Sequence, residues 1–163
     1  MTHNAPEIPT VAPERRPAAP ALRTLVVDDE QLARARLRTL LGDCQAPPAI
    51  VAGEAEEGGE ALRLLDAQPI DVVLLDIHMP GIDGVELARV LRGRADPLAV
   101  VFVTAQANHA VTAFELDAVD YLTKPVRAER LQQALAKAER YLKERRAEQA
   151  EAPAESLLIQ DRG

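Results

Sequence analysis

The sequence predicts an α/β fold, a doubly wound parallel sheet with helices on both faces. Apolar segments rich in Val, Leu and Ile alternate five times with segments of helical periodicity. The apolar segments are continuous, which is typical of strands that are buried on both faces of a parallel sheet. Right-handed crossovers between successive strands then place helices on both sides. We expect five strands in one sheet, in the order 2-1-3-4-5.

The strands are predicted from short apolar runs, each of which ends near a polar or turn residue. Order is expected to begin at Leu22, and the first run, "TLVV", leads directly into Asp28 and Asp29. The predicted strand segments are 24–27, 49–55, 70–76, 98–105 and 119–124.

The helices are predicted between the strands, where apolar residues recur at helical spacing. In the first helix Ala33, Leu37, Leu40 and Leu41 fall on one face. The fourth is short, and Asn108 is its expected N-cap. The predicted helical segments are 31–41, 58–68, 84–93, 108–118 and 128 to about 149.

Composition and charge exclude several classes of function. The net charge of −7 argues against nucleic-acid binding by this segment. Cys44 is the single cysteine, so no intramolecular disulfide can form, which fits a reducing cytosol. No apolar stretch approaches the roughly 18 residues of a membrane span, and the first residues lack the apolar core of a signal peptide. We expect a cytoplasmic location.

The chain divides into three regions by composition. Residues 1–21 are rich in Pro and Ala and are expected to form a disordered tail. Residues 22–146 form the predicted domain, and 147–163 a linker. Within that linker "SLLIQD" is either the first strand of a further domain that is cut short here or part of a disordered tail.

Polar residues follow four of the predicted strands at their carboxyl ends. These residues are Asp28 and Asp29, Asp76, Thr104 and Lys124. Ligands of open α/β sheets bind outside the carboxyl ends of the strands, so these side chains should converge at one edge. Each residue also has an ordinary structural interpretation, as a helix cap, a turn residue or a solvated strand end. For all of these ordinary interpretations to be correct, they would have to hold independently at four strand ends, and that conjunction is improbable.

The predicted convergence has a chemical consequence. Three carboxylates in one pocket repel one another, and a divalent cation relieves that repulsion. Mg²⁺ prefers oxygen ligands, and together with a lysine and a hydroxyl it suits a transferring phosphoryl group. One carboxylate is then free to act as the nucleophile. Asp76 is the candidate, because it stands alone at the end of the third strand.

The chain resembles the receiver domain of bacterial two-component response regulators. The segments "LVVDDE", "DVVLLDIHMPGIDG", "VVFVTA" and "DYLTKP" occur in the order and spacing of that family. The resemblance covers Leu22 to about Tyr141 and agrees with a flavodoxin-like sheet. It implies a switch that catalyses its own phosphorylation and slow hydrolysis and is not an enzyme in the usual sense.

The resemblance assigns the residues of the predicted site. Asp76 resembles the phosphoacceptor, and Mg²⁺ would be held by Asp28, Asp29, Asp76 and the backbone carbonyl of His78. The phosphoryl group would contact Thr104, Ala105 and Lys124, with Thr104 and Tyr121 as the switch pair. The peptide bond before Pro125 resembles one that is cis.

The resemblance also implies partners and an output. A histidine kinase would supply the phosphoryl group, and phosphorylation would favour a homodimer through the fourth helix, fifth strand and fifth helix. The candidate dimer residues are Phe114, Tyr121, Ala138 and Leu142. The run "AFELDAVDYLTKP" resembles the LytTR (LytR/AlgR-type) transcriptional regulators, in which a DNA-binding domain follows the receiver. The alternative is a stand-alone receiver that acts only through protein–protein interaction.

Three competing classes fit the sequence less well. A phosphatase of the haloacid dehalogenase type needs a second Asp two residues after the nucleophile, where this chain has His78. The glycines Gly53, Gly58 and Gly59 do not form a nucleotide-binding pattern. A degenerate receiver would lack the acidic set. His3, His78 and His109 share no ligand spacing, so His78 is interpreted as a partly exposed loop histidine. The positions of His78 and Gln106 resemble those that flank the path of the hydrolytic water in the receiver family.

Overall fold

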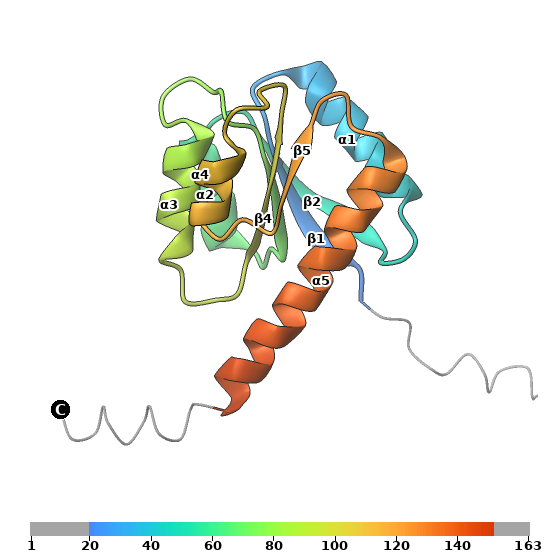
Figure 1. Ribbon diagram of the computed structural model, residues 1–163, viewed down its shortest axis with the longest axis vertical. Helices are drawn as coiled ribbons and strands as arrows, with labels where there is room; N and C mark the ends of the chain where they lie inside the picture. The colour runs from blue at the N-terminus through green and yellow to red at the C-terminus, as the bar shows by residue number, and fades with distance from the viewer. Residues whose placement is uncertain (1–19, 152–163) are drawn as a thin grey trace, which may run out of the picture.

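Five apolar segments form one parallel sheet in the computed structural model, which describes residues 20–151 (Figure 1). The order β2-β1-β3-β4-β5 confirms the predicted topology. The strands are β1 Leu22–Val27, β2 Ala49–Ala55, β3 Val72–Leu75, β4 Ala99–Thr104 and β5 Asp120–Thr123. Residues 1–19 of the tail predicted at 1–21, and the "SLLIQD" segment, lie outside the described residues.

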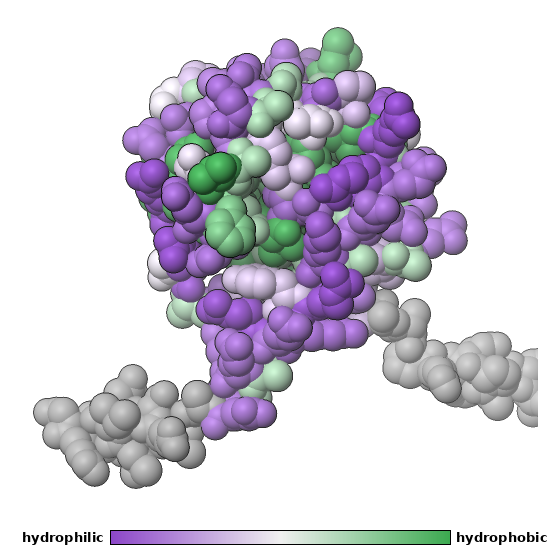
Figure 2. Space-filling view, viewed as in Figure 1, coloured by the Kyte–Doolittle hydropathy of each residue, from purple (hydrophilic) through white to green (hydrophobic). Residues whose placement is uncertain are grey.

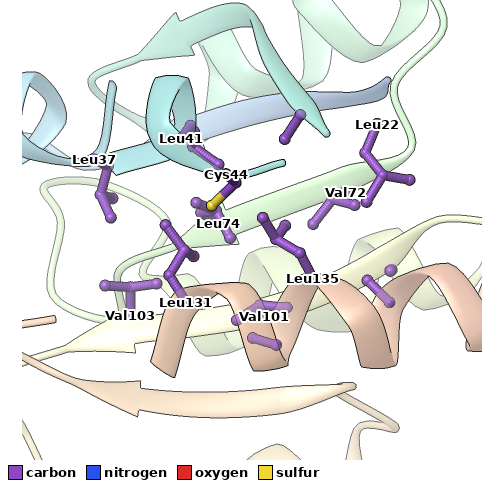
Figure 3. Close-up of a cluster of buried hydrophobic side chains, with 14 of the residues drawn as sticks. Leu22, Leu37, Leu41, Cys44, Val72, Leu74, Val101, Val103, Leu131 and Leu135 are labelled. Carbon is purple, nitrogen blue, oxygen red and sulfur yellow. The ribbon is translucent and has the colours of Figure 1, made fainter. Parts of the chain in front are cut away.

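Helices cover both faces of the sheet, and each face has its own apolar core (Figure 1). Side chains of α1 and α5 pack on one face, and side chains of α2, α3 and α4 pack on the other. Figure 3 shows the first core, where Leu37 and Leu41 of α1 gather with Leu131 and Leu135 of α5 on the same face of the sheet. The helices are α1 Gln31–Asp43, α2 Gly58–Ala67, α3 Gly84–Arg92, α4 Ala110–Glu115 and α5 Ala128–Glu151.

Helix α5 differs from the prediction in two respects. Ala138 and Leu142, which were candidate dimer residues, are 0% and 1% exposed and belong to the core that α5 shares with α1. Their heptad-like spacing with Leu131 and Leu135 therefore reflects packing on the sheet of the same chain. The assignment of Ala138 and Leu142 to a dimer face was wrong. The helix also continues through 147–151, which were assigned to the linker.

Helix α4 is shorter than predicted, and its N-cap is His109 instead of Asn108. The cap side chain makes no hydrogen bond to the helix. The backbone N–H of His109 instead donates to the hydroxyl of Tyr121 on β5, at 3.3 Å. The start of α4 is thus positioned by a contact with the sheet and not by a local cap.

Among residues 20–151, no helix combines the length and the apolar character that a membrane crossing requires.

Candidate functional site

The predicted polar residues meet at the carboxyl edge of the sheet. A pocket of about 310 Å³ opens there, and one loop after each of β1, β3, β4 and β5 contributes to it. Its lining consists of Asp29, Glu30, Asp76, His78, Thr104, Ala105, Gln106 and Lys124. Asp28 is buried next to this lining and accepts a hydrogen bond from the Lys124 ammonium. We call the group Asp28, Asp29, Asp76 and Lys124 the acidic pocket.

The register of the parallel strands places Asp28 beside Asp76. Val27 pairs with Leu75, so the next residue of each strand emerges at the same level. The backbone N–H of Asp76 donates to the carbonyl of Val27 at 3.0 Å, which continues the sheet by one more bond. Carboxylates that are far apart in sequence therefore become neighbours through strand pairing alone.

Both buried carboxylates have hydrogen-bond partners. Asp28 is 1% exposed, and its Oδ1 accepts from the backbone N–H of Glu30 at 2.9 Å. Asp76 is 7% exposed, and its Oδ1 accepts from the N–H of Ile77 at 2.8 Å. These donors offset part of the cost of burying a charge. Asp29, in contrast, is exposed at the mouth of the pocket.

Lys124 joins the two buried carboxylates. Its Nζ lies 2.7 Å from Oδ2 of Asp28 and 3.2 Å from Oδ2 of Asp76. Burial alone would lower the pKa of Lys124, but the hydrogen bond that it donates to Asp28 and the charges of Asp76 and Asp28 outweigh burial and raise the pKa. Its backbone N–H donates to the carbonyl of Thr104, and the bond to Pro125 is cis, the geometry that the resemblance implies.

The acidic pocket has the donor set of a site for a hard cation. Carboxylate oxygens of Asp28, Asp29 and Asp76 lie within 4.8 Å of one another. Three carboxylates with Lys124 leave an excess of negative charge, which a divalent cation would neutralise. Mg²⁺ takes oxygen ligands and keeps several waters, and the exposed side chain of Asp29 leaves room for them. The residues therefore fit Mg²⁺.

Gln106 connects the two proposed switch residues, a link that the sequence did not reveal. Its backbone N–H donates to Oγ1 of Thr104 at 3.2 Å. Its carbonyl accepts from the hydroxyl of Tyr121. Thr104 is buried at 1% exposure, whereas Tyr121 is half-buried and its ring packs beside Phe102. A displacement of the Thr104 hydroxyl would thus be transmitted to Tyr121 through one residue.

Gly84 shapes the loop that follows the phosphoacceptor candidate, and its role was also not predicted. A Cβ at this position would lie 2.1 Å from the backbone oxygen of Asp76 and 2.7 Å from Cα of Ile77. The N–H of Gly84 donates to the carbonyl of Ile77 at 2.7 Å. A glycine at the first position of a helix is a poor helix former, and that could have signalled a close backbone approach.

Comparison with known proteins identifies relatives. Residues 24–136 match the response regulator receiver domain family. The positive alginate biosynthesis regulatory protein of Pseudomonas aeruginosa is 48% identical over 119 residues, covering 73% of this chain and 48% of that protein. The sensory transduction protein LytT of Bacillus subtilis is 44% identical over 117 residues, which cover 71% of this chain and 47% of the LytT chain. The chain thus spans about half the length of the curated relatives it matches.

Solved structures have the same fold. The response regulatory domain of mrkE from Klebsiella pneumoniae superposes with a TM-score of 0.68 at 33% identity, covering 76% of this chain and 99% of that one. The REC domain of AraT from Geobacillus stearothermophilus superposes with a TM-score of 0.69 at 30% identity, covering 78% of this chain and 99% of that one.

Proposed function

The chain belongs to the response regulator receiver domain family, with relatives of the LytR and LytT type, and from this premise we propose that Asp76 accepts a phosphoryl group from a histidine kinase. The domain is the receiver of a two-component system and not a conventional catalytic enzyme. The observation that carries the proposal is the convergence of Asp28, Asp76 and Lys124 from three separate strands.

The transfer would be an in-line displacement at phosphorus. A carboxylate oxygen of Asp76 forms the new bond as the bond to the kinase histidine breaks, and the histidine nitrogen keeps the electron pair. Lys124, within 3.2 Å of Asp76, would neutralise charge on the phosphoryl oxygens. Mg²⁺ held by Asp28, Asp29, Asp76 and the carbonyl of His78 would supply further positive charge there. The side chains of His78 and Gln106, at the mouth, would set the rate of hydrolysis.

The switch would operate through the connection that Gln106 makes. A phosphoryl oxygen on Asp76 would accept a hydrogen bond from the Thr104 hydroxyl and draw it into the pocket, away from the N–H of Gln106 that donates to the same hydroxyl oxygen. Movement of Thr104 would release Gln106, and the hydroxyl of Tyr121 would lose the carbonyl to which it donates. The phosphoryl group can shift this equilibrium because the two positions of Thr104 interact with it differently.

The output surface would be the face formed by α4, β5 and α5. Figure 2 shows hydrophobic side chains gathered over α4 beside the polar surface of α5. Val111 and Phe114 are 73% and 81% exposed, so both are available to a partner copy. We propose that phosphorylation favours a homodimer through Phe114 and Tyr121. Light scattering with beryllofluoride should show the dimer, and an unchanged mass would contradict it.

Transcriptional output would require a DNA-binding domain beyond the receiver. The family match at 24–136 lies within 22–146, and the curated relatives are about twice the length that this chain covers, which supports a further domain after the receiver. Residues 147–163, the first of which belong to α5, would form the connection. The net charge of −7 gives the chain itself little affinity for DNA. If this receiver alone binds protein partners in a phosphorylation-dependent way, the alternative of a stand-alone receiver that acts only through protein–protein interaction is favoured.

Acetyl phosphate labelling tests the proposed function. With Mg²⁺ present, the wild-type chain should gain the mass of one phosphoryl group, and Asp76→Asn should gain none. Asp96→Asn is the matched control, because Asp96 is exposed and outside the acidic pocket, and it should label like wild type. Labelling of Asp76→Asn at the wild-type level would disprove the assignment.

A further inference from the structure

Two histidines from separate elements lie side by side at the rim of the acidic pocket. His78 is in the loop after β3, and His109 is the N-cap residue of α4. Their ring centroids are 6.0 Å apart, and the ring planes are inclined by 77°. These residues have no ligand spacing in the sequence, so the tertiary fold alone makes them neighbours.

Both imidazoles are available to a ligand. His78 is exposed and His109 is half-buried. Within residues 20–151, neither ring takes part in a hydrogen bond or an ion pair. Asp29 and Glu30 line the same pocket as His78, so the surroundings carry negative charge that favours a cation.

The chemistry of the pair differs from that of the acidic pocket. Imidazole nitrogens bind Zn²⁺, Ni²⁺ and Cu²⁺ well, whereas Mg²⁺ prefers oxygen ligands. Zinc–nitrogen bonds are about 2.0–2.1 Å, so rings at the observed spacing can share one ion after small rotations. We propose that His78 and His109 form a second cation site that takes a borderline-soft divalent metal such as Zn²⁺.

The site would connect two segments that take part in switching, an inference that rests on the proposed function. The backbone N–H of His109 donates to the hydroxyl of Tyr121, the proposed switch residue. An ion shared by His78 and His109 ties the start of α4 to the loop after β3. Zn²⁺ therefore favours the conformer seen here and opposes phosphorylation, because it binds this arrangement of the two rings better than a displaced one.

Calorimetry with Zn²⁺ tests the site itself. The host is the full chain carrying His3→Ala, because the sequence has three histidines and this leaves only the proposed pair. An excess of Mg²⁺ is present throughout, so that the acidic pocket is occupied. One Zn²⁺ per chain is expected, and His78→Ala and His109→Ala should each lose this binding.

A carboxylate variant separates the two sites. Asp28→Asn should keep Zn²⁺ binding, since Asp28 is not one of the proposed ligands. Absence of binding in the host would overturn the proposal. So would binding that survives both histidine substitutions and disappears in Asp28→Asn, because the ion would then occupy the acidic pocket.

The rate of labelling by acetyl phosphate tests the coupling. Zn²⁺ should slow labelling of the host in excess Mg²⁺ and should have no such effect on His109→Ala. Equal rates with and without Zn²⁺ would overturn the coupling. If the host does not label under any condition, the proposed function fails, while calorimetry still decides whether the histidine site exists.

Discussion

Two clusters of charged residues in this domain are built in opposite ways. In the acidic pocket three aspartates surround Lys124. On β5, a lone carboxylate, Asp120, receives both guanidinium nitrogens of Arg130 at 2.8 and 2.7 Å and the Lys137 ammonium at 3.2 Å. We call the group Asp120, Arg130 and Lys137 the Asp120 cluster. Its charges are satisfied by the chain itself, whereas those of the acidic pocket are not.

The difference teaches how a functional site is recognised. Burial would raise the pKa of Asp120, but hydrogen bonds from Arg130, the N–H of Tyr121 and Lys137 outweigh it and lower the pKa. That cluster holds β5 against α5 and has no need of a ligand. The acidic pocket keeps an excess of negative charge at an open mouth, which is a cost in the isolated fold and an advantage when cations and phosphate bind. Removal of a carboxylate charge should therefore change the free energy of unfolding with opposite signs in the two clusters.

The largest effect is expected from Gly84→Ala, which disrupts the frame of the acidic pocket. The new methyl group would collide with the backbone of Asp76 and Ile77, so the loop must shift. We expect a loss of about 3 kcal/mol in the free energy of unfolding, measured by urea denaturation, and loss of labelling at Asp76. Gly42→Ala in α1 is the control, because a Cβ there meets nothing within 4 Å and should raise stability slightly. Equal effects of the two substitutions would refute the role given to Gly84.

Asp120→Asn should have the next largest effect. It removes the charge that pairs with Arg130 and Lys137 while the side chain of residue 120 stays largely buried, at 8% exposure. Because both cations are partly exposed, we expect a loss of only about 1–2 kcal/mol in urea unfolding. Asp96→Asn, at an exposed position, should change stability by less than about 0.5 kcal/mol.

The stability gap between wild type and Asp120→Asn should depend on pH. The pKa of Asp120 is lower in the folded chain than in the unfolded chain, whose value is about 3.9. The contribution is therefore complete at neutral pH and is lost as the pH falls below about 4, through the folded pKa. A gap that stays constant down to pH 2 would contradict the assigned ion pair.

The smallest effect on the free energy of unfolding is expected from Asp76→Asn, and it should be an increase, whereas Gly84→Ala and Asp120→Asn should cause losses. Without divalent cations the substitution relieves repulsion with Asp28 and Asp29, and it should raise the free energy of unfolding by up to about 1 kcal/mol. Added Mg²⁺ should stabilise the wild type by about 1.4 kcal/mol at ten times its dissociation constant, and the variant by less. Thermal denaturation with and without Mg²⁺ measures both quantities. If Asp76→Asn destabilises the metal-free protein, repulsion between the carboxylates does not lower the stability of the wild type.

Much of the fold and site followed from local patterns. The continuous apolar runs predicted the strands, and the end of each run predicted which polar residues share the carboxyl edge. The prediction was less successful where a pattern had two physical explanations. The spacing of Ala138 and Leu142 suits both a dimer seam and a sheet contact, and only their burial shows that it is the latter.

The sequence by itself determined the α/β class and the convergence of Asp28, Asp76, Thr104 and Lys124 at one edge, because apolar periodicity and the topology of parallel sheets indicate these features. The strand order was expected from the flavodoxin-like type of doubly wound sheet that the family resemblance implies. Only the tertiary structure decided which groups touch. The link through Gln106, the close approach at Gly84 and the pairing of His78 with His109 depend on distances between loops far apart in the chain, and no local pattern encodes those distances.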